Sequence, residues 1–123
     1  MRKLIFMGTL LLVIQILMQG CIKHCNQPLI KGKLIYRSCA SIVVEVLDSN
    51  YYSLGQSTWQ SSMPPKNIYH HVFTVANHCS FPAMTVGKEF TFKVISNDVN
   101  NCAVCALFDA PPLQKQLIKV TDK

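Results

Sequence analysis

The stretch Glu89-Phe90-Thr91-Phe92-Lys93-Val94-Ile95 decides the fold class, because apolar and polar side chains alternate along it. In an extended chain successive side chains point to opposite faces, so its aromatic and aliphatic residues share one face and its charged and hydroxyl residues share the other. The pattern predicts a β-strand with one buried face and one wet face. Val86-Gly87-Lys88 immediately before it predicts a turn.

Three further segments predict strands. Ile42 to Leu47 is rich in β-branched residues and predicts a strand that begins near Lys33. Ile68 to Ala76 alternates as well, and one predicted face carries Tyr69, His71, Phe73 and Val75. Cys102 to Phe108 is apolar, follows a polar turn over residues 96–101, and ends before Pro111-Pro112. Residues 113–120 fit either a short C-terminal helix or, over Ile118 to Val120, an edge strand.

Asp48 to Asn67 shows no apolar period and contains Pro64-Pro65, so it predicts a loop of about 20 residues. Tyr51, Tyr52 and Trp59 lie in this loop. Exposed aromatic side chains there would serve as binding anchors, and the alternative is that they fold back over the sheet. Four or five strands with little helix favour an all-β domain, either a small closed barrel of the OB type or a two-sheet sandwich.

The N-terminus predicts a signal peptide over residues 1–20. Arg2 and Lys3 precede an apolar run from Leu4 to Met18, which is too short for a stable membrane span. Cleavage after Gly20 would make Cys21 the first residue of one domain, 21–123, that is secreted and extracellular. A lipid-modified Cys21 is the alternative, although Met18 and Gln19 match such a signal poorly.

Six cysteines lie at or after this cleavage site, which predicts three disulfides in an oxidising compartment: Cys21, Cys25, Cys39, Cys79, Cys102 and Cys105. A competing hypothesis reads Cys102-Ala-Val-Cys105 as a metal or redox pair, with ligands among four histidines: His24, His70, His71 and His78. Disulfides are favoured, because no redox-type strand-turn-helix context surrounds Cys102. We therefore expect no cofactor and no metal of its own.

Composition argues against two classes of function. Of 12 Lys and Arg, ten remain after Arg2 and Lys3 are removed, against six Asp and Glu. This mild excess of about four positive charges is scattered, so nucleic acid is not an expected partner. No acidic pair stands near a candidate nucleophile, so the chain is not expected to be an enzyme.

Three short motifs follow one another along the chain: Cys39-Ala-Ser-Ile-Val-Val-Glu-Val-Leu47, then Val72-Phe-Thr-Val-Ala-Asn-His-Cys79 followed by Val86-Gly-Lys-Glu-Phe90, and finally Cys105-Ala-Leu-Phe-Asp-Ala-Pro-Pro112. Together they resemble netrin-like modules and the tissue inhibitors of metalloproteinases. They occur in the family's order over most of residues 21–120. The resemblance implies a five-stranded OB-like closed barrel with its N-terminal segment tied across it by disulfides.

The resemblance also implies an inhibitory site. The amine and carbonyl of Cys21 would chelate the zinc of an extracellular metalloproteinase, and Ile22 would enter the primary specificity pocket. Lys23 and His24 would extend this ridge, flanked by the strand end Ala76, Asn77, His78 and Cys79. The implied disulfides are Cys21 with Cys79, Cys25 with Cys105, and Cys39 with Cys102.

Two departures separate the chain from the inhibitors. Three residues lie between Cys21 and Cys25, where the family has one, and the chain lacks the further cysteine that pairs with the family's third. Three functions therefore stay open: a monomeric metalloproteinase inhibitor, a non-inhibitory netrin-like module that binds matrix or a receptor, and a disulfide-stapled defence peptide or toxin.

Overall fold

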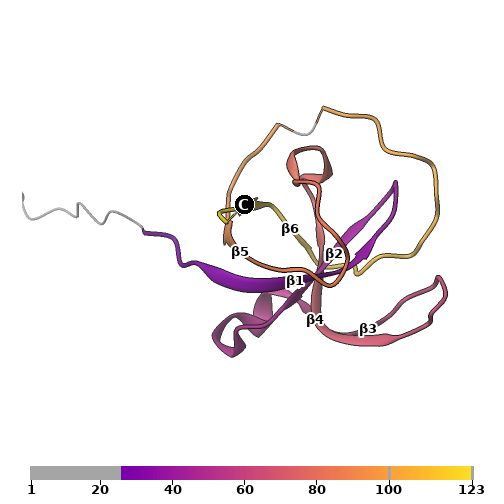
Figure 1. The fold of residues 1–123 in the computed structure, drawn as a ribbon, viewed down its shortest axis with the longest axis horizontal. Coiled ribbons are helices and arrows are strands. Elements are labelled where there is room, and N and C mark those ends of the chain that lie inside the picture. The colour runs from indigo at the N-terminus through magenta and orange to yellow at the C-terminus, as the bar shows by residue number, and fades with distance from the viewer. Residues whose placement is uncertain (1–25, 100, 123) are drawn as a thin grey trace, which may run out of the picture.

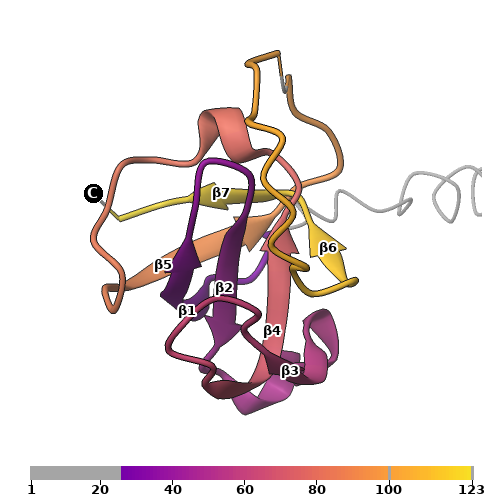
Figure 2. The ribbon, with the colours of Figure 1, turned by 90° about the vertical axis from the view of Figure 1, so that its right-hand side faces the viewer.

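The computed structural model describes residues 26–99 and 101–122, and their strands form one sheet (Figures 1 and 2). The strands are β1 (Ile30–Arg37), β2 (Ile42–Val46), β3 (Gln56–Gln60), β4 (Ile68–Val75), β5 (Glu89–Val94), β6 (Lys115–Gln116) and β7 (Ile118–Val120). Two short 3-10 helices, η1 (Ser49–Leu54) and η2 (His78–Ser80), complete the regular structure. The predicted all-β class is confirmed.

The predicted closed five-stranded barrel is wrong, because the seven strands form a sheet that is not closed. The order is β3-β4-β2-β1-β5-β7, and β6 pairs with β4 in parallel. The C-terminal segment therefore pairs with two strands that are far apart in the sheet order. β6 pairs with β4 and β7 pairs with β5, with Leu117 between β6 and β7 (Figure 2). Of the two C-terminal alternatives, the structure has the strand and not the helix.

The main core lies on one face of this sheet, and its composition confirms the alternation predicted for β5. Phe90 and Phe92 are almost fully buried, and the Phe92 ring meets that of Phe73 edge-on at 5.7 Å between centroids. Val94 packs against the same cluster. Edge-on aromatic pairs add to the free energy gained by burying apolar area, so these rings contribute strongly to stability.

A second, smaller cluster lies on the opposite face of the sheet and consists of Ile35, Val43, Trp59 and Val72. Its existence explains why β2 is buried on both faces: Val43 packs into this cluster, whereas the adjacent Val44 packs into the main core. The sequence predicted the strand but gave no sign of the second cluster.

The strict alternation predicted for β4 fails at His71. Tyr69 and Val72 contact the same cluster although they are three residues apart. His71 between them has a φ of 54°, in the left-handed region, which changes the direction of the following side chains as a bulge does. Phe73 and Val75 consequently lie in the main core, while Tyr69 lies on the other face.

The predicted loop from Asp48 to Asn67 is only partly a loop. It contains η1 and β3, which pairs with β4 so that Trp59 lies opposite Tyr69. Gln56-Ser-Thr-Trp-Gln60 has little apolar character, so β3 forms through backbone pairing at the edge of the sheet and not through an alternating pattern.

The strand predicted over Cys102 to Phe108 is absent. This segment has no strand hydrogen bonding, and Phe108 is 91% exposed. Its apolar character predicts burial, but every residue from Cys102 to Phe108 is exposed. The segment is instead attached to the β1–β2 turn and to η2 through its two cysteines.

The structure also corrects the implied disulfide pairing. Cys39 bonds to Cys105 and Cys79 bonds to Cys102, each with 5.5 Å between Cα atoms, which is within the usual range for a disulfide. The suggested pairs Cys21/Cys79, Cys25/Cys105 and Cys39/Cys102 are therefore wrong. The reason is the course of residues 102–105, which pass beside the η2 region and the β1–β2 turn. These bonds also remove the metal or redox reading of Cys102 and Cys105.

Residues 109–112 pass over the second cluster, as the hydrogen bond from Trp59 Nε1 to the Ala110 carbonyl shows. Three backbone carbonyls accept side-chain hydrogen bonds: that of Asp109 from Ser62 Oγ, that of Ala110 from Trp59 Nε1, and that of Pro112 from Thr74 Oγ1. Because this segment passes over polar and aromatic groups of β3 and β4, it satisfies them and shields the apolar side chains below.

The Asp109 carboxylate attaches residues 109–112 to β1 and to the β1–β2 turn. It is 2% exposed and accepts hydrogen bonds from Tyr36 Oη at 3.1 Å, Ser41 Oγ at 2.7 Å, and Ser38 Oγ. Burial by itself raises the pKa of this carboxyl, but the three hydroxyl donors outweigh burial and lower it. The charged form is therefore the one that the folded protein stabilises.

We expect Asp109→Asn to lower the free energy of unfolding at pH 7 by about 2 kcal/mol, since it removes a charge that three hydroxyls solvate. Because the folded pKa is depressed, this contribution is present above the unfolded pKa and is lost as pH falls below about 4. Urea unfolding between pH 3 and pH 7 measures it, with Asp48→Asn as the matched control. Equal pH dependence in wild type and Asp109→Asn would contradict the assignment.

Candidate functional site

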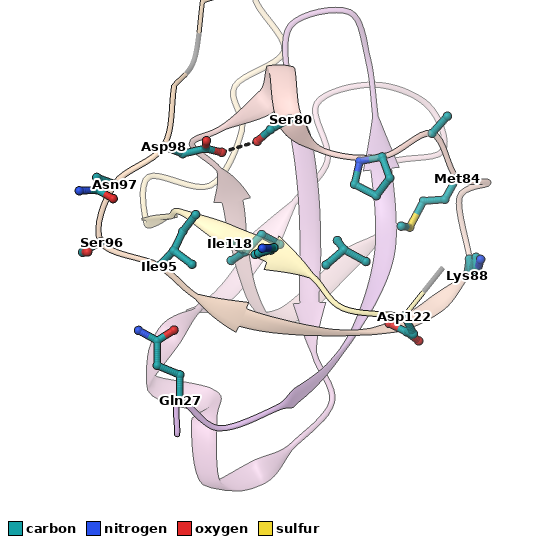
Figure 3. Close-up of a pocket in the computed structure, with 14 residues that line it drawn as sticks. Gln27, Ser80, Met84, Lys88, Ile95, Ser96, Asn97, Asp98, Ile118 and Asp122 are labelled. Carbon is teal, nitrogen blue, oxygen red and sulfur yellow. Dashed lines mark hydrogen bonds between the residues drawn. The ribbon is translucent and has the colours of Figure 1, made fainter. Parts of the chain in front are cut away.

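A hollow of about 800 Å³ lies beside β7 (Figure 3). Its size falls within the range of about 300–1,000 Å³ that is usual for small-molecule sites. Most of its lining comes from the end of η2 and the segment after it, the segment after β5, and the C-terminal strand, and Gln27 and Lys88 complete it. Its lining residues are Gln27, Ser80, Pro82, Ala83, Met84, Lys88, Ile95, Ser96, Asn97, Asp98, Ile118, Lys119, Val120 and Asp122.

The buried amide of Asn77 joins these parts of the chain. Its Nδ2 lies 2.7 Å from Ser80 Oγ, 2.8 Å from Asp98 Oδ2 and 2.7 Å from the Ile118 carbonyl. Its Oδ1 accepts a hydrogen bond from the Ile118 backbone N–H at 3.0 Å. One side chain, 1% exposed, thus fixes η2, the segment after β5 and β7 relative to one another. The wall of the hollow is therefore held in place by hydrogen bonds within the folded chain.

Both carboxylates that line the hollow are engaged by donors of the fold. Hydrogen bonds from Ser80 and Asn77 lower the pKa of Asp98. The backbone N–H of Thr91, 2.5 Å from Asp122 Oδ1, and the Thr91 hydroxyl at 2.9 Å lower the pKa of Asp122. Figure 3 places Asp98 and Asp122 at opposite ends of the hollow.

The lysines of the hollow are not engaged in the same way. Among residues 26–99 and 101–122, neither Lys88 nor Lys119 has a carboxylate oxygen within 4.0 Å. Each is near enough to lower the pKa of one carboxyl, Lys119 that of Asp98 and Lys88 that of Asp122. Both ammonium groups therefore keep their hydrogen-bonding capacity.

Apolar side chains form the remaining lining. Ile118 is buried, and Met84 and Val120 are half-buried against the main core. Ile95 is half-buried at the end where β5 stops. The hollow thus combines an apolar surface continuous with the core and two lysine ammonium groups that make no ion pair among the described residues.

Of the predicted site residues, the four nearest the N-terminus lie outside the described residues: Cys21, Ile22, Lys23 and His24. Ala76 and Cys79 belong to the sheet end and to a disulfide, respectively: the Ala76 N–H donates to the Gln116 carbonyl at 2.9 Å. His78 lies in η2, and its buried Nε2 has no hydrogen-bond partner among the described residues.

The predicted aromatic anchors do not form one exposed surface. Trp59 is 7% exposed and belongs to the second cluster. Tyr51 packs against the main core. Tyr52 is partly exposed, and its ring stacks on that of His71 with 3.7 Å between centroids. The alternative in which these side chains fold back over the sheet is the one that the structure shows for Trp59 and Tyr51.

Sequence reasoning missed the hollow, although two of its parts were noticed. The polar turn at residues 96–101 contributes Asn97 and Asp98, and the alternation of Ile118 and Val120 contributes the floor. The resemblance implied that Asn77 flanks the Cys21 ridge, but nothing in the sequence indicated that its side chain would join these two parts.

Comparisons with known proteins assign no function to this site. No family model, no curated protein and no solved structure matches the chain. Within the part of the chain that the structure describes, no three His, Cys, Asp or Glu side chains gather as a metal site. No helix in that part is long and apolar enough to cross a membrane.

Proposed function

We propose that this protein is a secreted, disulfide-stabilised binding module that takes a small ligand in the hollow beside β7. The single observation that carries the proposal is the hollow itself, with its apolar lining, free cations and walls fixed by Asn77. Two disulfides are compatible with an extracellular protein and support the predicted signal peptide. The resemblance of the three sequence motifs to netrin-like modules is consistent with a non-inhibitory binding role.

The binding role is favoured over zinc chelation because of Cys79. In the inhibitory mechanism implied by the resemblance, a disulfide to Cys79 holds Cys21 beside the strand end. Here Cys79 is bonded to Cys102, so this tether is not formed. Without it, ordering the N-terminal residue on a protease zinc would cost more free energy. We expect no tight inhibition from a panel of matrix metalloproteinases.

The test is a screen of low-molecular-weight compounds by protein-observed NMR on the secreted protein. We expect compounds that shift the amides of Ile95 and Lys119, and we expect Ala83→Trp to abolish their binding by filling the hollow. Ala106→Trp is the matched control, because Ala106 is also exposed but lies outside the hollow. A screen without such compounds, or equal binding by both variants, would refute the proposal.

A further inference from the structure

We infer that the ligand of the hollow is an organic anion with an apolar body, such as a medium-chain carboxylate, whose charged group lies at Lys119. The inference rests on the proposed function and adds the chemical class of the ligand. Three observations lead to it: the apolar lining, the unequal hydrogen bonding of the charges, and the register of β5 against β7.

The apolar lining favours a ligand that carries hydrocarbon. Met84, Ile95 and Val120 are only half-buried, so each leaves apolar surface in contact with water. Burying that surface is worth about 25 cal/mol per Å². A small polar molecule would gain nothing from it, whereas an alkyl chain would.

The hydrogen bonding decides the sign of the ligand charge. Asp98 and Asp122 already accept bonds from side chains and backbone of the fold, as their lowered pKa values reflect. Lys88 and Lys119 make no ion pair within the described residues. A cationic ligand would have to share acceptors already in use, while an anionic ligand would meet free donors.

The sheet register places a further cation beside Lys119. Lys93 of β5 and Lys119 of β7 lie directly opposite each other in the antiparallel pair. Residues in such pairs project from the same face, and like charges there are destabilising. An anion bound at Lys119 would relieve this repulsion. Lys93 does not line the hollow, so it adds positive charge near Lys119 without contacting the ligand.

Three probes of equal chain length test the inference: decanoate, 1-decanol and decylammonium, each titrated into the full secreted protein and followed by NMR. We expect decanoate to bind most tightly and decylammonium least. Lys119→Gln should weaken decanoate binding about fivefold and leave 1-decanol unchanged, since one exposed ion pair is worth up to ~1 kcal/mol. Lys66→Gln, an exposed lysine outside the hollow, is the matched control.

The outcomes separate this inference from the proposed function. If 1-decanol binds as tightly as decanoate, or if Lys119→Gln has no effect, the hollow is a binding site but its ligand is not an anion. If none of the three probes binds and the compound screen also finds nothing, both the inference and the proposed function fail. Ala83→Trp should abolish binding of all three probes.

Discussion

Replacing Cys39 and Cys105 together with serine is expected to lower the free energy of unfolding by about 4 kcal/mol. The bond joins residues 66 positions apart, so its loss frees a long loop of the unfolded chain. In the folded protein it attaches the segment after residue 102 to the β1–β2 turn, next to the Asp109 carboxylate. Urea unfolding under non-reducing conditions measures the change.

The other described disulfide provides the control. Cys79 and Cys102 are 23 positions apart, and the same chain-entropy argument expects a loss of about 3 kcal/mol for their double serine variant. Peptide mapping of the intact protein should recover Cys39 linked to Cys105 and Cys79 linked to Cys102. Recovery of Cys21 linked to Cys79 would contradict the structure and restore the inhibitory mechanism.

Gly55→Ala is expected to lower the free energy of unfolding by about 3 kcal/mol, although alanine suits the local backbone. The φ of Gly55 is −111°, which any residue adopts, so conformation adds no cost. A Cβ there would lie 2.3 Å from the carbonyl carbon of His71 and 2.6 Å from the nitrogen of Val72. Both atoms belong to the backbone of β4 and cannot move without opening the sheet.

Gly87→Ala separates this steric cost from a conformational one. Gly87 has a φ of 96°, which disfavours alanine, but a Cβ there would meet nothing within 4 Å. We expect a loss of about 1 kcal/mol for this variant. Thermal unfolding of both variants measures the difference. A smaller loss for Gly55→Ala than for Gly87→Ala would show that β4 does not approach Gly55 so closely.

The candidate site was only partly predictable because its parts are distant in sequence. Asp98 and Lys119 are on different segments, and Asn77, which connects their elements, looked like an ordinary strand end. A single sequence shows which side chains are polar but not which of them are in contact in the folded protein. The hollow forms only because these distant segments contact one another.

Local patterns were sufficient to predict the all-β class, the buried face of β5 and the turn at Gly87, because alternation and turn chemistry act between near neighbours. The packing of distant segments fixed β3, the exposed course of residues 102–108, the disulfide partners and the open sheet. Backbone pairing and cysteine bonding depend on which distant segments come together, and the same apolar run can be buried or exposed according to which other segments pack against it.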